Sequence, residues 1–146
     1  MNRDQRNKSL NELLRGEISA QETYQQVLEK VDEDPLQVQE LRRIHQDHTE
    51  AAELLRREIS KEGGSPENES GMWGGFAKAV TGTAKVFGDK AALKALKEGE
   101  EHGFKSYQRA LEDEGLSQDD KQLISSRLIP LQQQHIQIID RFMEAI

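Results

Sequence analysis

With 146 residues, of which 32% are charged and 34% hydrophobic, the chain has the composition of a soluble, helix-rich protein. The net charge of −7 argues against binding to nucleic acid or to a membrane surface, because both attract basic proteins. The absence of cysteine excludes disulfides, thiolate metal sites and cysteine nucleophiles.

Two amphipathic helices are predicted in the first half of the chain. The first spans residues 9–31, or begins at Asp4 if the first turn is ordered. The second spans residues 35–62, with Pro35 at a first helical position, where its missing N–H does no harm. The pair Gly63-Gly64 is a C-terminal signal for the second helix. Their inward positions follow the 3–4 spacing typical of bundle packing. These positions are Leu10, Leu14, Glu17, Gln21, Tyr24, Leu28 and Val31 in the first helix, and Leu41, His45, His48, Ala52, Leu55 and Ile59 in the second.

Residues 63–88 form the predicted connection to the second half. Within it, the segment Trp73–Phe87 has an apolar face that predicts a short extra helix, running along or across the helices as a lid. We expect this face to cap the core. The alternative is that the face is exposed, in which case it is a contact surface for a homo-oligomer or a protein partner.

Two further helices are predicted over residues 89–113 and 117–145. Ser117 and Asp120 resemble a capping box at the start of the fourth helix. Pro130 is expected to kink that helix, because it removes one backbone hydrogen bond. The inward positions are Leu93, Leu96, Glu100, Phe104, Tyr107 and Leu111 in the third helix, and Ile124, Leu128, Leu131, His135, Ile138, Ile139 and Phe142 in the fourth.

Two helical hairpins joined by one long connection predict an all-α fold, with residues 1–146 in a single four-helix-bundle domain. One long crossover between the second and third helices is the connectivity of ferritin-like bundles. Residues 10–29 and 93–112, which lie 83 positions apart, share eight identities in 20 aligned positions. Such an internal repeat indicates an architecture of two similar halves.

One polar residue interrupts the apolar stripe of each helix: Glu17, His48, Glu100 and His135. Counting residues back to the hairpin turns places all four within one helical turn of the same height, near the middle of the bundle. Two carboxylates and two imidazoles in an apolar interior are costly unless they are paired. A divalent cation would neutralise the carboxylates and accept the neutral imidazoles, so the pattern predicts a metal site at these four residues.

The motifs around these positions resemble known proteins. Glu17 followed by Tyr24, and Glu100 followed by Tyr107, is similar to the glutamate–tyrosine pattern of ferritin and bacterioferritin. The segments GEISAQETY and EGEEHGFKSYQRAL resemble an uncharacterised bacterial family of ferritin-like four-helix-bundle proteins. This resemblance covers nearly the whole chain and implies the bundle fold, whereas the activity of that family is unassigned.

The chain departs from the di-iron members of such bundles at two positions. Those members carry Glu-x-x-His on two helices, and the glutamates bridge the metals. The equivalent positions here are His45 and Gln132, so both bridging carboxylates are missing. We therefore expect one Fe, Mn or Zn ion, since nitrogen and oxygen ligands do not choose among these metals. Tyr24, Tyr107, His45 and Gln132 are expected around the ligands, the tyrosines as hydrogen-bond donors and His45 as an optional fifth ligand.

Two functions are open on the sequence alone. In the first, the chain is a metal-binding ferritin-like protein that handles iron or peroxide during stress. In the second, it is a non-catalytic bundle for assembly or partner binding, and Glu–His hydrogen bonds satisfy the layer without an ion. One of the two facing carboxyls, Glu17 or Glu100, would then have a raised pKa. The sequence does not decide whether the chain is an enzyme.

Several classes of partner are not expected. The N-terminal residues lack the apolar core of a secretory signal, and no run approaches the roughly 18 apolar residues of a membrane span. We therefore expect a cytoplasmic protein without a membrane partner. Nothing resembles a phosphate loop, a nucleophile elbow or a nucleic-acid motif, so neither an organic cofactor nor a nucleic-acid partner is expected.

Overall fold

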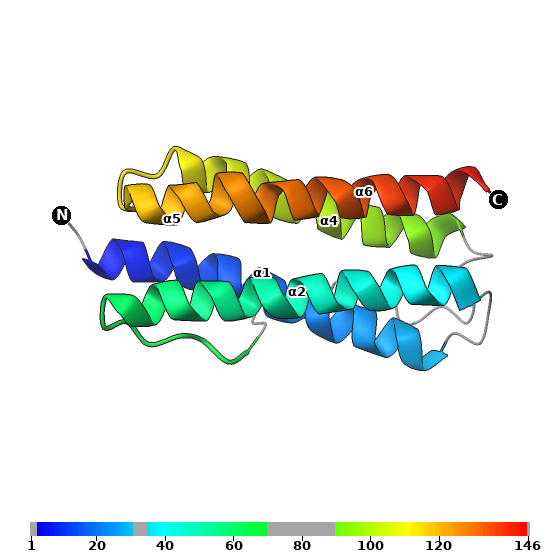
Figure 1. The fold of residues 1–146 in the computed structure, drawn as a ribbon, viewed down its shortest axis with the longest axis horizontal. Helices are drawn as coiled ribbons and strands as arrows, with labels where there is room; N and C mark the ends of the chain where they lie inside the picture. The colour runs from blue at the N-terminus through cyan, green and yellow to red at the C-terminus, as the bar shows by residue number, and fades with distance from the viewer. Residues whose placement is uncertain (1–2, 31–34, 70–89, 146) are drawn as a thin grey trace.

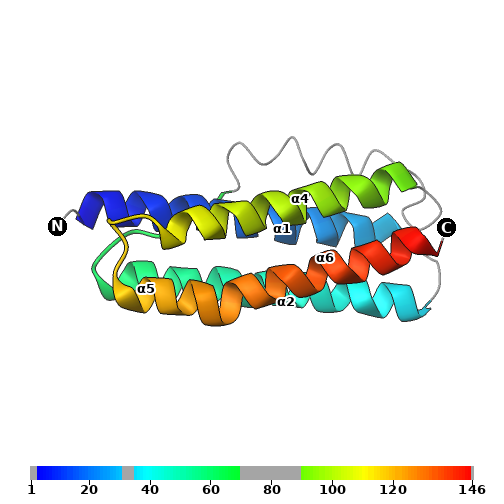
Figure 2. The ribbon, with the colours of Figure 1, turned by 90° about the horizontal axis from the view of Figure 1, so that it is seen from above.

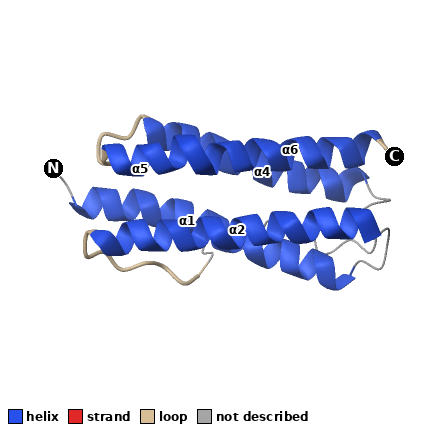
Figure 3. Cartoon of the chain, in the orientation of Figure 1, coloured by secondary structure: helices blue, strands red, loops and turns tan. Residues whose placement is uncertain are grey.

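The computed structural model describes residues 3–30, 35–69 and 90–145, and within these ranges every regular element is a helix (Figures 1 and 3). Three of the long helices are continuous and the fourth is assembled from three consecutive pieces. The elements are α1 (Arg3–Lys30), α2 (Pro35–Lys61), α4 (Lys90–Leu111), α5 (Gln118–Leu123), the π-helical turn η2 (Ile124–Leu128) and α6 (Ile129–Glu144). The described chain is therefore a four-helix bundle.

The helices lie side by side along one long axis (Figures 1 and 2). Helix α1 packs against α2, and α4 packs against α6. The start of α1 and the start of α5 lie at one end of the bundle, and α6 ends at the other (Figure 1). None of the described helices is long and apolar enough to cross a membrane.

The core is divided into two apolar clusters with a polar layer between them. One cluster contains Leu10, Leu14, Leu55, Ile59, Ile124 and Leu128, all buried. The other contains Val27, Leu41, Ile44, Leu93, Leu96 and Ile139, also buried. His48, Glu100 and His135 fall between the two clusters along their helices, and Glu17 lies at the edge of the first cluster, next to Ile18. Apolar packing on both sides therefore fixes the depth of the layer.

The inward face differs from the predicted stripe at several positions, and two of them lie beside the polar layer. On α2, Ile44 is fully buried and His45 is only half-buried, because the buried positions run from Leu41 to Ile44 to His48 in steps of three and four. On α6, Gln132 is buried, with 4% of its surface exposed, and Leu131 is half-buried. In each case the buried residue is the sequence neighbour of the predicted one: Ile44 in place of His45, and Gln132 in place of Leu131.

The π-helical turn explains the shift in the last helix. Its wider turn lets the N–H of Ile129 donate to the carbonyl of Ile124, five residues earlier. Pro130 then stands in the first turn of α6, where a missing N–H costs little. The chain therefore accommodates Pro130 through this turn, where the sequence predicted only a kink. The extra residue brings Ile124, Leu128 and Gln132, spaced by four, onto one face.

The end of the bundle where α1 and α5 begin is held by an ion pair. Helix α1 starts at Arg3, next to Asp4, the earlier of its two predicted starts. The buried guanidinium of Arg6 donates to both carboxylate oxygens of Asp120 at 2.8 and 2.9 Å. Asp120 also completes the predicted capping box, since its side chain accepts from the N–H of Ser117 and its own N–H donates to the Ser117 hydroxyl. This contact ties the first helix to the last.

The predicted end of α2 is confirmed. Gly63 has a φ of 80°, a left-handed conformation that glycine adopts without strain. The N–H groups of Gly63 and Gly64 donate to the carbonyls of Ser60 and Ile59 at 3.0 Å. The segment Trp73–Phe87, with its predicted extra helix and contact surface, lies outside the described residues.

Candidate metal centre

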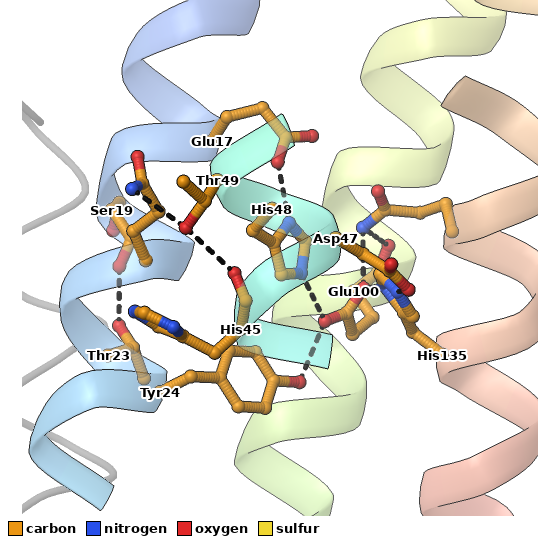
Figure 4. Close-up of polar contacts among 12 residues, drawn as sticks. Glu17, Ser19, Thr23, Tyr24, His45, Asp47, His48, Thr49, Glu100 and His135 are labelled. Carbon is orange, nitrogen blue, oxygen red and sulfur yellow. Dashed lines mark hydrogen bonds and ion pairs between the residues drawn. The ribbon is translucent and has the colours of Figure 1, made fainter. Parts of the chain in front are cut away.

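Four helices contribute to the polar layer (Figure 4). Glu17 comes from α1, His48 from α2, Glu100 from α4 and His135 from α6. All four side chains are at least 95% buried. Their common depth follows from the apolar clusters on either side, as the heights counted from the sequence predicted.

The His48 ring lies between the two glutamates. Its Nδ1 is 2.5 Å from Oε2 of Glu17, and its Nε2 is 2.8 Å from Oε2 of Glu100. The ring of Tyr24 stacks on it, with centroids 5.5 Å apart and planes inclined by 21°. The imidazole is thus held on both nitrogens and on one face.

The His135 ring is held in the same way by a different pair of carboxylates. Its Nδ1 is 3.1 Å from Oε1 of Glu100, and its Nε2 is 2.9 Å from Oδ2 of Asp47 on α2. Gln132 lies one turn earlier on α6 and donates to Oε1 of Glu100 at 2.8 Å and to its backbone carbonyl at 3.0 Å. Glu100 is therefore shared by both histidines.

The two tyrosines link the halves of the internal repeat. Tyr24 donates to Oε2 of Glu100 at 2.7 Å, and Tyr107 donates to Oε1 of Glu17 at 2.5 Å. Each tyrosine therefore serves the glutamate of the opposite repeat, although each has a glutamate seven residues earlier in its own helix. The contact is reciprocal, as expected for two similar halves that face each other.

The geometry assigns a charge to both rings. Each of the four ring nitrogens faces a carboxylate oxygen, and only an imidazolium can donate from both of its nitrogens. Burial by itself lowers the pKa of His48, but the charges of Glu100 and Glu17 outweigh burial and raise the pKa well above its ordinary value. Burial also lowers the pKa of His135, yet the charge of Glu100 and the hydrogen bond to Asp47 raise it overall.

Glu100 is not the carboxyl with the raised pKa that the sequence allowed for one of the two glutamates. Burial pushes its pKa up, but the charges of His48 and His135 and their hydrogen bonds hold the pKa far below its ordinary value. Glu17 and Glu100 do not face each other directly, because the His48 ring lies between them and contacts both carboxylates.

Three of the predicted ligands form a compact group. One ligand atom from each of His48, Glu100 and His135 can be chosen so that all three lie within 4.8 Å of one another. Glu17 lies on the far side of the His48 ring, where its two oxygens accept from His48 and Tyr107.

His45 and Asp47 differ from the sequence prediction. His45 is half-buried, and its ring lies on the Thr23 side, away from Glu100 (Figure 4). Asp47 was missed because it directly precedes His48 and so projects from α2 about 100° away, outside the apolar stripe. The only signal for it was its position beside His48 on the helix that faces α6.

Comparison with known proteins identifies the family of the chain. The family described as "Domain of unknown function (DUF2383)" matches residues 5–113, which include Glu17, His48 and Glu100, whereas His135 follows the matched segment. No curated protein and no solved structure gave a match. Since the match spans well over half of the 146 residues, the chain belongs to the DUF2383 family.

Proposed function

We propose that this chain is a ferritin-like bundle that binds one divalent transition-metal ion through Nε2 of His48, Nδ1 of His135 and the carboxylate of Glu100. The observation that carries the proposal is the buried group of these three ligands, converging from three helices within 4.8 Å. Two imidazoles and a carboxylate are donors that Fe²⁺, Mn²⁺ and Zn²⁺ all accept.

The separations within the group support a single ion. Ligand atoms that bind a tetrahedral metal at about 2.0–2.2 Å lie about 3.4 Å from one another. Nε2 of His48 and Nδ1 of His135 lie 2.8 and 3.1 Å from the oxygens of Glu100, so each contact would open by only a few tenths of an ångström. The widest separation in the group, up to 4.8 Å, would have to close as the ligands turn toward the ion.

The charge of the layer supports a divalent ion in particular. Two protons now lie between Glu100 and the facing nitrogens of His48 and His135. A divalent cation in their place would leave the net charge of the buried layer unchanged. Metal binding would then exchange two protons for one ion, as ligand deprotonation generally requires.

In the proposed site, each histidine is oriented by a carboxylate that contacts the ring nitrogen opposite the ligand atom. Glu17 holds Nδ1 of His48, and Asp47 holds Nε2 of His135, in each case on the nitrogen opposite the ligand atom. Carboxylate–histidine–metal arrangements of this kind fix ring orientation in metalloproteins. We therefore assign Glu17, which the sequence placed among the ligands, to this orienting role.

A second ion is not part of the proposal. Gln132 donates an N–H toward Glu100, so it occupies the place of a bridging carboxylate without its charge. Among the described residues, the group of His48, Glu100 and His135 is the one set of three that could hold an ion. A role in iron handling or oxidative stress rests on the family resemblance, so the first experiment addresses the metal itself.

Elemental analysis of protein purified without chelator tests the proposal. We expect about one transition-metal ion per chain, lost in Glu100→Gln and in His135→Gln. The matched control is His102→Gln, because His102 is an exposed histidine on α4 outside the layer, and it should keep the metal. Added metal should also raise the melting temperature, since a ligand of the native state stabilises it. The proposal would be overturned if the purified protein is metal-free and its melting temperature does not change on addition of Fe²⁺, Mn²⁺ or Zn²⁺.

One observation favours the alternative of a metal-free structural layer. Among the described residues, the buried side-chain nitrogen and oxygen atoms without a hydrogen-bond partner are Arg6 Nη1 and Asn7 Oδ1, and neither belongs to the layer. The layer is thus satisfied by its own hydrogen bonds. In this alternative the chain is a non-catalytic bundle that acts through assembly or a partner, with the segment Trp73–Phe87 as the proposed contact surface.

A further inference from the structure

A small cavity adjoins the proposed metal ligands. It lies between α1 and α4, has a volume of about 40 Å³, and is lined by Glu17, Glu100 and His48 at its polar end. Its lining also includes Tyr24, Tyr107 and Gln132, which donate hydrogen bonds to these glutamates. Four small residues at positions related by the internal repeat leave space between the two helices: Gly16 and Ala20 on α1, and Gly99 and Gly103 on α4.

The cavity meets the ligand group from one side. Its lining includes His48 and Glu100, and it does not include His135. His135 approaches Glu100 from α6, through Oε1, whereas His48 contacts Oε2. An ion held by the three ligands would therefore have His135 on the α6 side and the cavity on the side of α1 and α4, next to the Tyr24 hydroxyl that donates to Oε2 of Glu100.

The cavity also adjoins a larger groove on the described bundle. This groove lies between α1 and α4, has a volume of about 520 Å³, and shares Glu12, Leu13 and Ser106 with the cavity. A small molecule in the groove would therefore be separated from the cavity by these shared side chains alone. The inner cavity has room for only a few water-sized molecules, since one water needs about 10–15 Å³ measured in the same way.

We propose that this cavity is the binding site for an exogenous ligand of two or three non-hydrogen atoms, of the class of dioxygen, peroxide or azide, placed on the open side of the metal. The inference rests on the proposed metal site and adds to it an open coordination position and a limit on ligand size. Three protein ligands with open positions are the arrangement of metal centres that bind small molecules, whereas a structural ion has a closed set.

Cobalt-loaded protein and azide provide the test. Co²⁺ reports changes in coordination through its visible absorption, and azide is the probe of matching size. We expect azide to shift the spectrum of the wild-type protein, and benzoate, which is too large for the cavity, to leave it unchanged.

A cavity-filling variant places the effect in the cavity. In Ala20→Leu the larger side chain should occupy the space between α1 and α4, so azide should lose its effect while Co²⁺ still binds with wild-type stoichiometry. The control is Ala95→Leu, which enlarges another half-buried alanine that does not line the cavity and should keep the azide response. Ser106→Leu fills the junction of cavity and groove from α4 and serves as a second variant if Ala20→Leu does not fold.

The outcomes separate this inference from the proposed function. Absence of Co²⁺ binding in the wild type would overturn both. Stoichiometric Co²⁺ with no azide response, or an azide response that persists in Ala20→Leu, would overturn the cavity site and leave the metal site standing. A response to benzoate equal to that of azide would overturn the size limit and with it the assigned ligand class.

Discussion

Glu100 and Glu17 differ in how many hydrogen bonds stabilise their charge. Glu100 accepts from the side chains of Tyr24, His48, Gln132 and His135, which fills the four lone-pair positions of a carboxylate. Glu17 accepts from two side chains, His48 and Tyr107. A buried carboxylate with fewer donors depends more strongly on each of them.

This difference predicts unequal effects for two similar substitutions. Tyr24→Phe removes one of four donors from Glu100, whereas Tyr107→Phe removes one of two from Glu17. Both rings remain in place, so packing changes little. We expect Tyr107→Phe to lower the free energy of unfolding by about 2–3 kcal/mol and Tyr24→Phe by about 1 kcal/mol. Urea denaturation of metal-free protein at neutral pH measures both values, and equal losses would contradict the argument.

At the scale of the helices, close approach between α4 and α6 positions Gln132. Gly103 faces the Gln132 amide, and a Cβ atom built on it would lie 2.7 Å from Nε2. That nitrogen donates to the backbone carbonyl and to the carboxylate of Glu100. The glycine is therefore needed for the approach of the amide, although glycine within a helix costs about 1 kcal/mol relative to alanine.

We predict that the effect of Gly103→Ala on the free energy of unfolding changes sign when Gln132 is removed. Gly103→Ala in the wild-type chain should be destabilising, because the displaced amide loses two buried hydrogen bonds at roughly 1 kcal/mol or more each. In a Gln132→Ala background the amide is absent, so the new Cβ atom has no close contact with it. Gly103→Ala should then raise the free energy of unfolding by about 0.5–1 kcal/mol, because alanine has a higher helix propensity than glycine. A double-mutant cycle by urea denaturation measures the difference. The same sign in both backgrounds would show that the contact does not constrain the two helices.

At the scale of the whole molecule, the spacing of apolar residues within each helix predicted part of the site. The residues that depend on which helices pack together could not be predicted from this spacing. The stripes predicted the depth of Glu17, His48 and Glu100, because each lies between apolar residues of its own helix. Asp47 could not be found in this way, since its role depends on which helix packs beside α2. Gln132 was displaced from the predicted face by the π-helical turn, which has no clear signal other than Pro130.

The ion pair between Arg6 and Asp120 is a further contact that depends on tertiary structure, because it joins the first turns of α1 to α5 across 114 positions of sequence. Both side chains are buried, and Arg6 also donates to the backbone carbonyl of Glu58 on α2 at 2.8 Å. Burial alone raises the pKa of Asp120, but the hydrogen bonds from Arg6 and Ser117 lower it below its ordinary value of 3.8. Three helices are therefore linked through the guanidinium of Arg6.

The lowered pKa of Asp120 predicts a stability difference that depends on pH. A carboxyl whose pKa is lower in the folded state contributes stability above its unfolded pKa, and this contribution is lost as the pH falls through the folded value. Asp120→Asn should therefore be destabilising by about 3 kcal/mol at pH 7, because the buried Arg6 charge loses its closest anionic partner, and the ion pair that it keeps with Glu58 is longer, at 3.8 Å. The difference in free energy of unfolding between Asp120→Asn and the wild type should become smaller as the pH falls below about 4, where the wild-type carboxyl also becomes protonated.

Urea denaturation of both proteins between pH 7 and pH 3 measures this difference. The control is Asp119→Asn, an exposed neighbour on α5, which should show little difference from the wild type at either pH. A destabilisation of Asp120→Asn that is constant across this range would mean that the carboxylate charge does not hold the ends of the helices together.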